Sequence, residues 1–269
     1  TLIQQRSEEK NRAQIIAANN VFNAIFMVAS AIFGIIALVI LELSIPTYFL
    51  ILAVLNIFAA AYIYSTVPEF VLRFFIWMLT HTLYRINDKG LDNIPETGPA
   101  VLVCNHVSFV DAMLIAGSYQ RPIRFVMDRS IAEMKGLKTF FKIAKTIPIC
   151  SPKADIDTYE NAFKRIKEEL DDGELICIFP EGKLTTDGEV DTFKSGIERI
   201  LKESAVPVVP MALEGMWGSF FSHKSGHALT TRPKRFWSKI SLTAAPLQSA
   251  ETVTAKSLEL DVKALLSKN

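Results

Sequence analysis

The chain has 269 residues, which is enough for one large domain with an appendage. Its formal net charge is +1, so bulk charge gives no indication of a nucleic-acid partner. Half of its residues are hydrophobic, and the mean hydropathy of +0.26 is high for a soluble protein. The apolar residues gather in the first 86 positions, so the N-terminal third differs in character from the rest.

The cysteines and histidines give no indication of a metal centre. Each of the three cysteines lies in or at the end of an apolar run, which is typical of small core residues in a reducing compartment. No Cys-x-x-Cys pair occurs. His223 and His227 are four residues apart, but no third ligand is apparent. We therefore predict no metal and no organic cofactor.

Two uncharged apolar runs, residues 21–41 and 45–64, predict a membrane hairpin. As a helix, the first run would span roughly 31 Å, close to the hydrocarbon thickness. Basic residues precede the first run and follow the second, while the short link carries only Glu42. The positive-inside rule then places both ends of the chain in the cytoplasm. The alternative is a pair of buried core helices in a soluble protein.

Residues 69–86 read EFVLRFFIWMLTHTLYRI, with polar residues interrupting an apolar pattern. Trp77 and Tyr84 are amphipathic anchors, so we expect a helix lying on the membrane surface. We predict three parts: the hairpin in 1–66, an interfacial helix and linker in 67–90, and a globular domain in 91–269. The chain starts with Thr1 and not Met, so we expect a fragment whose hairpin closes a longer transporter.

The globular part alternates short apolar runs with helical patterns. The predicted strands are PAVLVCNH, PIRFVMD, TIPIC, ELICIFP, VPVVPMAL and KISLTAAP. The predicted helices are FVDAMLIAGSY, SIAEMKGLKTFFKIAK, DTYENAFKRIKEELDDG, FKSGIERILKES and the tail after residue 251. Uninterrupted apolar strands spaced by helices predict an α/β fold with a mostly parallel, layered sheet. In such sheets, ligands bind beyond the carboxyl ends of the strands.

Two of these strand ends carry polar residues with possible chemistry. His106 follows the run VLVC, and Asp111 falls in the first turn of the next helix. A loop of this length lets the carboxylate bond one imidazole nitrogen, which leaves the other as a base near neutral pH. No nucleophile accompanies the pair, and no Gly-x-Ser-x-Gly occurs. Activation of a substrate hydroxyl fits these residues; a histidine that merely caps a helix is the alternative.

The second strand end is IFPEGKLTTDGEV. A phosphate-binding P-loop is excluded, because the required Gly and Ser or Thr positions hold Cys177 and Leu184. Glu181 and Gly182 at a strand end are also compatible with an ordinary turn.

The combination of motifs is more specific than either motif alone. Asn-His-x4-Asp, then Phe-Pro-Glu-Gly about 75 residues later, then VPVVP resemble the glycerolipid acyltransferase family of lysophospholipid acyltransferases, over about residues 85–250. The resemblance implies transfer of a fatty acyl chain from acyl-CoA or acyl carrier protein to a lysophospholipid hydroxyl. It implies that His106 is the base and that Asp111 orients it. The block with Glu181, Gly182, Lys183 and Thr185 would hold the acceptor's head group.

The sequence departs from the family pattern at the phosphate-binding arginine, whose place is taken by Leu184, with Lys183 beside it. A site with less charge for phosphate suits a phosphodiester, so we expect lysophosphatidylethanolamine as acceptor, with 1-acylglycerol 3-phosphate as the alternative. The string EGKLTTDG is similar to the 2-acylglycerophosphoethanolamine acyltransferase and acyl-carrier-protein synthetase group. That group implies a fused transporter upstream, an adenylate-forming ligase downstream and a bacterial inner membrane.

The stretch from Arg121 to Lys153 holds eight basic residues and two acidic ones. It is either a solvated surface or a contact for anionic lipid or an acidic acyl carrier protein. A non-catalytic lipid-binding module attached to a transporter is the alternative from another functional class, although binding alone requires no base.

Overall fold

The computed structural model describes residues 12–219, 221 and 237–267. The chain separates into two compact units, Thr1–Thr66 and Val67–Asn269. His223 and His227, considered above as a metal pair, lie outside the described residues.

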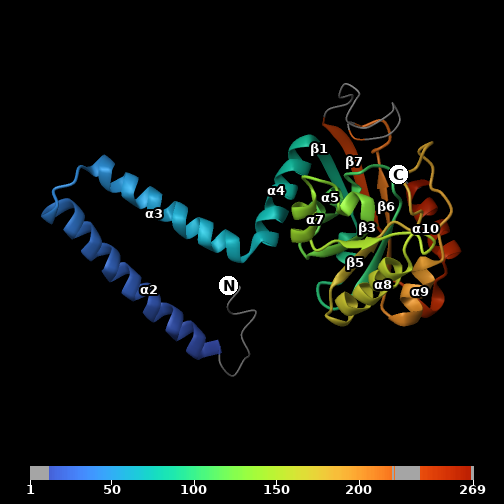
Figure 1. Cartoon of the computed structure of the whole chain (residues 1–269), viewed down its shortest axis with the longest axis horizontal. Coiled ribbons are helices and arrows are strands. Elements are labelled where there is room, and N and C mark those ends of the chain that lie inside the picture. The colour runs from blue at the N-terminus through green and yellow to red at the C-terminus, as the bar shows by residue number, and fades with distance from the viewer. Residues whose placement is uncertain (1–11, 220, 222–236, 268–269) are drawn as a thin grey trace. The chain divides into compact units, whose positions relative to one another are not determined.

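The first unit is a pair of apolar helices (Figure 1). Helix α2 (Arg12–Ile35) continues into a π-helical turn, Ile36–Ile40, and α3 spans Ile45–Thr66. Glu42, with φ of 49°, lies in the short link, and Ser44 Oγ accepts a hydrogen bond from Thr47 N at the start of α3. The two helical stretches, Ala13–Ile40 and Ile45–Thr66, are long and apolar enough to cross a membrane. Length and composition thus agree with the predicted hairpin.

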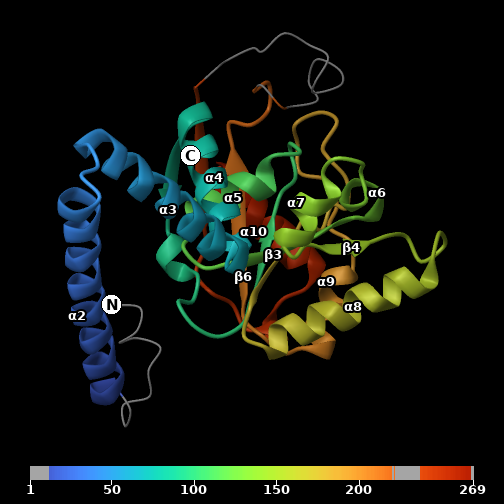
Figure 2. The same ribbon diagram turned by 60° about the vertical axis from the view of Figure 1, so that its left-hand side comes forward.

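The second unit contains a seven-stranded sheet in the order β1-β7-β6-β2-β5-β3-β4 (Figures 1 and 2). The strands are β1 (Tyr84–Lys89), β2 (Ala100–Cys104), β3 (Ile123–Asp128), β4 (Ile147–Ile149), β5 (Leu175–Ile178), β6 (Val208–Glu214) and β7 (Ser238–Ala244). The five strands from β6 to β4 run parallel to one another. Strand β7 and the edge strand β1 are parallel to each other and run antiparallel to β6. The predicted α/β fold with a mostly parallel sheet is confirmed.

Helices cover the sheet on both faces, because its central strands are apolar on both sides. One core contains Leu102 and Cys104 of β2 with residues of α5 (Asp111–Ser118), against which α4 (Pro68–Leu83) packs. The other core contains Val101 and Val103 of β2 with residues of α8 (Ile156–Asp171), α9 (Gly196–Glu203) and α10 (Ala255–Ser267). Alternate residues of β2 therefore enter opposite cores.

The sheet begins earlier than predicted. Residues 67–90 were expected to form a helix and a linker, but Tyr84–Lys89 is strand β1. Its register with β7 pairs Tyr84 with Ser238, so the partner lies more than 150 residues further along the chain. A strand with so remote a partner has no neighbouring strand in the sequence to mark it. Most residues of β1 are exposed and polar, a pattern that is also typical of a linker.

The predicted helix SIAEMKGLKTFFKIAK is also wrong as a single element. The structure has two short helices there, α6 (Arg129–Ala132) and α7 (Lys138–Ile143). Gly136 lies between them with a φ of 89°, a left-handed conformation that interrupts helical geometry. The glycine breaks the helical pattern that its neighbours favour.

Helix α4 has one side in the domain and one side in solvent. Ile76 and Thr80 are buried, and Gly117 of α5 allows close approach, because a Cβ there would collide with Thr80 Oγ1. On the other side, Phe70 and Trp77 are at least half exposed. This exposed aromatic side agrees with the interfacial position that the sequence predicts for the helix.

Candidate active site

The loop after β2 is fixed to the neighbouring strand by Asn105. Its side chain donates from Nδ2 to Leu213 O at 3.0 Å and accepts from Leu213 N at 2.8 Å. This pair of hydrogen bonds reproduces a sheet ladder at the point where β2 has ended. The next residue, His106, is thereby placed at the carboxyl edge of the sheet, where ligands bind in α/β folds.

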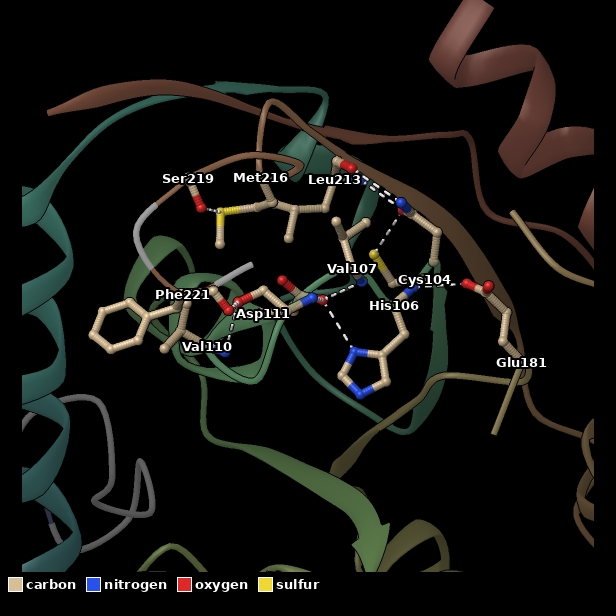
Figure 3. A network of polar contacts seen from close by, with 12 residues as sticks. Cys104, His106, Val107, Val110, Asp111, Glu181, Leu213, Met216, Ser219 and Phe221 are labelled. Carbon is tan, nitrogen blue, oxygen red and sulfur yellow. Dashed lines mark hydrogen bonds and ion pairs between the residues drawn. The ribbon is translucent and has the colours of Figure 1, made fainter. Parts of the chain in front are cut away.

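His106 and Asp111 form the predicted contact. His106 Nδ1 lies 3.0 Å from Asp111 Oδ2, and the same oxygen accepts from Val107 N at 2.7 Å and Ser108 N at 2.8 Å (Figure 3). The Asp111 side chain is fully buried, while that of His106 is 22% exposed. Three donors thus hold one carboxylate oxygen, and the carboxylate in turn fixes the imidazole.

The outer side of His106 packs on an aromatic ring. Phe179, which follows β5, stacks on the imidazole with ring centroids 4.2 Å apart. Nε2 has no hydrogen bond to any described part of the chain. An imidazole that is held at Nδ1 and stacked on one side presents Nε2 as its reactive nitrogen.

The other oxygen of Asp111, Oδ1, is buried and has no hydrogen-bond partner among the described residues. The same is true of Tyr84 Oη, at the start of β1. Burial raises the pKa of Tyr84 to about 12; the nearby hydroxyl of Ser219 opposes this, and the charge of Asp111 adds to it. Tyr84 therefore stays protonated near neutral pH and is not a second base.

Glu181, after β5, joins two loops at this edge. Its Oε1 accepts from His106 N at 2.7 Å, and its Oε2 accepts from Asp191 N at 2.9 Å. The residue is 1% exposed. Burial raises the pKa of Glu181, while the two backbone N–H groups lower it. Since each oxygen accepts a backbone N–H of the chain, Glu181 is placed to position His106. Its predicted contact with a head group stays a prediction.

Thr185 has a similar positioning role. Its N–H donates to His106 O at 2.9 Å, and its hydroxyl donates to Glu189 O at 2.8 Å. The side chain is buried and bonded within the loop, and its predicted contact with a head group stays a prediction. Gly182, with a φ of 67°, makes the tight turn between Glu181 and Lys183 in a conformation that favours glycine.

The two lysines of this loop differ in their surroundings. Lys183 Nζ lies 2.7 Å from Asp191, so its charge is paired within the loop. Lys194 lies over Gly182, where an added Cβ would collide with its ammonium group. Lys194 is exposed and makes no ion pair in the described structure. Sequence reasoning missed it because it stands 13 positions after Glu181, outside the motif.

The basic stretch after Arg121 does not act as one surface. Arg124 is buried and pairs with Glu69, Glu169 and Glu174, which fixes α4 to the sheet. Arg129 pairs with Asp155 at 2.6 Å. The lysines of this stretch remain exposed. The two arginines therefore stabilise the domain and leave the lysines as its accessible charge.

No cluster of three metal-ligating side chains occurs among residues 12–219, 221 and 237–267. Cys104 is fully buried, and burial raises its pKa well above the ordinary range. Ser108 is buried as well and donates to Phe221 O at 3.0 Å. Neither side chain beside His106 is thus placed as a nucleophile.

Comparison with known proteins shows which family this chain resembles. Residues 85–214 match the family model described as Acyltransferase, and this range holds His106, Asp111 and the loop after β5. The chain also resembles a crystal structure titled 1-acyl-sn-glycerophosphate (LPA) acyltransferase, PlsC, from Thermotoga maritima. The TM-score is 0.55 at 21% identity, over 93% of this chain and 96% of that one, which is a likeness of fold. The match and the fold support the glycerolipid acyltransferase family.

The curated relatives have consistent names. A chloroplastic 1-acyl-sn-glycerol-3-phosphate acyltransferase of Arabidopsis thaliana, LPAT1, is 29% identical over 55% of this chain and 41% of its own length. A 1-acyl-sn-glycerol-3-phosphate acyltransferase of Pseudomonas aeruginosa is 28% identical over 66% of this chain and 65% of its own length. The chain thus spans about two fifths of the plant relative. Both relatives are named as 1-acyl-sn-glycerol-3-phosphate acyltransferases.

Proposed function

We propose that this protein transfers a fatty acyl group from a thioester donor to the free hydroxyl of a lysophospholipid. The observation that carries the proposal is the His106 Nδ1–Asp111 Oδ2 contact of 3.0 Å at the carboxyl edge of the sheet. A fixed imidazole without a protein nucleophile suits direct attack by a substrate hydroxyl. The names of the relatives support the same reaction class.

In the proposed mechanism, His106 Nε2 takes the proton of the acceptor hydroxyl as its oxygen attacks the thioester carbonyl. The new C–O bond gives a tetrahedral intermediate, which collapses with cleavage of the C–S bond. The imidazolium then returns its proton to the leaving thiolate, so one ester and one thiol are formed. Asp111 holds the imidazole in one orientation and stabilises its charged form.

The names of the relatives favour 1-acylglycerol 3-phosphate as the acceptor. Lys194 beside Gly182 would supply positive charge for its phosphate. Lysophosphatidylethanolamine is the second candidate, favoured by Leu184 in place of an arginine and by the pairing of Lys183 with Asp191. A lysine without an arginine fork suits a singly charged diester better than a doubly charged monoester.

The remaining assignments belong to the same proposal. Acyl-CoA or acyl carrier protein would be the donor, and no metal or prosthetic group would take part. The exposed lysines that follow Arg129 would face anionic lipid or an acidic carrier. The hairpin in 1–66 would anchor the chain, with α4 at the interface and the domain on the cytoplasmic side. A fused transporter and ligase remain proposals from sequence resemblance.

A panel assay tests this function. The purified full chain is supplied with lysophosphatidic acid or lysophosphatidylethanolamine, each with acyl-CoA and with acyl carrier protein as donor, and diacyl products are identified by mass spectrometry. We expect product with at least one lysophospholipid, and none in the His106→Ala protein. Folded wild-type protein that acylates no lysophospholipid under any of these conditions would exclude the proposal.

A further inference from the structure

Two cations lie opposite each other on the neighbouring strands β1 and β7. The parallel register of β1 and β7 pairs Arg85 directly with Lys239. Their neighbours Tyr84 and Ile240 lie in the core with α5, so strand alternation puts both cations on the opposite face. Like charges directly opposite on neighbouring strands are destabilising. A negatively charged group close to Arg85 and Lys239 would offset this repulsion.

The described chain supplies one carboxylate nearby, Glu214, which forms no ion pair with either cation. Arg85 and Lys239 are both exposed, and neither forms an ion pair with a described carboxylate. They line a hollow of about 710 Å³, together with Asn87, Lys89, Glu214 and Ser241. Ser241 Oγ is shielded from solvent and has no hydrogen-bond partner among the described residues. Arg85 and Lys239, two cations without an ion pair, thus lie in one hollow with a single carboxylate.

An exposed tryptophan, Trp237, lies next to Arg85. The guanidinium of Arg85 lies 5.6 Å from the ring centroid of Trp237. Trp237 is 59% exposed and has a φ of 61°, a left-handed conformation that is strained for a bulky residue. Local strain of this kind is concentrated at ligand-binding positions. The cation–π contact also limits where the guanidinium can point.

We propose that Arg85 and Lys239 form a binding site for a phosphate group, separate from His106. The planar guanidinium of Arg85 can donate two parallel hydrogen bonds to phosphate oxygens, and the ammonium of Lys239 adds a second positive charge. Asn87, two residues further along the same face and exposed, adds a neutral donor. The phosphate comes either from a soluble phosphate ester or from the head group of a membrane phospholipid.

The proposed phosphate site lies at the same edge of the sheet as His106 but is separate from the His106–Asp111 pair. Because β1 and β7 run opposite to β6, their first residues lie at the sheet edge where β6 and β2 end. His106 follows β2 at that edge, on the other side of β6. A phosphate bound here would therefore lie at the edge that the substrates approach.

Trp237 provides the test. Its fluorescence, identified by comparison with Trp237→Phe, is followed in the full chain without any thioester donor, so the result does not depend on acyl transfer. One arm adds inorganic phosphate or glycerol 3-phosphate to protein in neutral detergent. The other arm compares nanodiscs of phosphatidylcholine with nanodiscs that contain phosphatidylglycerol. Lys239→Gln is the main variant, because it leaves Arg85 over the tryptophan.

We expect a saturable response in one arm, and Lys239→Gln should weaken it by roughly tenfold, the cost of one charge-assisted contact. Lys202→Gln, which removes an exposed charge on α9, is the matched control and should respond as wild type. A response to the soluble anions identifies a soluble ester, and a response to phosphatidylglycerol alone identifies a lipid. No response in either arm, or an undiminished response in Lys239→Gln, overturns the site.

Thermal melting gives a second measurement. In phosphate-free buffer at low salt, Lys239→Gln should melt at a higher temperature than wild type, because it removes the like-charge pair. Phosphate should raise the melting temperature of wild type and not that of the variant. If the variant melts lower and keeps the phosphate effect, the two cations have another role and the proposal is wrong.

Discussion

Two buried carboxylates, Asp111 and Glu181, follow neighbouring strands and have different partners. Asp111 bonds the side chain of His106 and two backbone N–H groups. Glu181 bonds only backbone N–H groups, those of His106 and Asp191. Both therefore fix His106, one through its imidazole and the other through its main chain.

Because of this difference, we expect Asp111 to affect the chemical step and Glu181 to affect the position of His106. A carboxylate that contacts an imidazole affects both its orientation and the stability of its charged form. A carboxylate that contacts peptide groups acts mainly through orientation, since those groups do not titrate, and the charge of Glu181 reaches the imidazole only through space. Substitutions of the two residues should therefore differ in size and in kind.

The largest effect is expected at His106 itself. His106→Ala removes the base that both carboxylates hold, and should lower kcat by roughly 10²–10⁴. The measurement is the initial rate of ester formation with saturating donor and acceptor. His81→Ala on α4 is the matched control, because that histidine bonds Trp77 O, outside the site. Comparable rates in the two variants would remove His106 from the mechanism.

Asp111→Asn comes next. The amide keeps the size of the side chain but presents a neutral group to His106 Nδ1, so the imidazole loses its ionic partner. We expect kcat to fall by roughly 10² with little change in KM, because the loss is in the chemical step. Asp171→Asn, at an exposed ion pair of α8, controls for charge. An increase in KM at constant kcat would instead indicate a role in binding.

Glu181→Gln should have a smaller and different effect. Its amide can accept from only one of the two backbone donors, so a buried hydrogen bond is lost. We expect about 1.5–3 kcal/mol less stability in denaturant unfolding. Misplacement of His106 should lower activity roughly tenfold. The exposed Glu189→Gln is the control. A loss of activity as large as that of Asp111→Asn, without a loss of stability, would contradict the separation of roles.

The smallest effect concerns the acceptor. Leu184→Arg adds a guanidinium fork to the loop after β5, and should shift kcat/KM toward 1-acylglycerol 3-phosphate by roughly two- to fivefold, as expected of an exposed charge pair. Thr186→Arg places the same charge on an exposed neighbour. The two acceptors compete in one vesicle assay. Equal shifts in both variants would mean that charge alone, and not position 184, determines the preference.

The sequence predicted the parts of the molecule whose signals are local. The run VLVC before His106 and the five-residue spacing to Asp111 were sufficient for a strand end with a held imidazole. The order of elements likewise predicted a mostly parallel sheet. These features depend on residues close together in the chain.

The parts that were missed depend on remote contacts. Strand β1 pairs with β7, far along the chain, so no local pattern marks it. The role of Glu181 depends on N–H groups of His106 and Asp191, and backbone partners leave no trace in residue type. Lys194 reaches Gly182 because its own backbone N–H donates to Pro180 O, a contact that spacing alone does not predict.

The central claim is that His106 directs the acyl group to a lysophospholipid hydroxyl and not to water. The most direct measurement follows thiol release and ester formation together, with a lysophospholipid and with its analogue lacking the free hydroxyl. We predict that thiol release equals ester formation with the natural acceptor, and falls to the background rate with the analogue or in His106→Ala. Thiol release that continues at the same rate with the analogue would show a thioesterase and contradict the account.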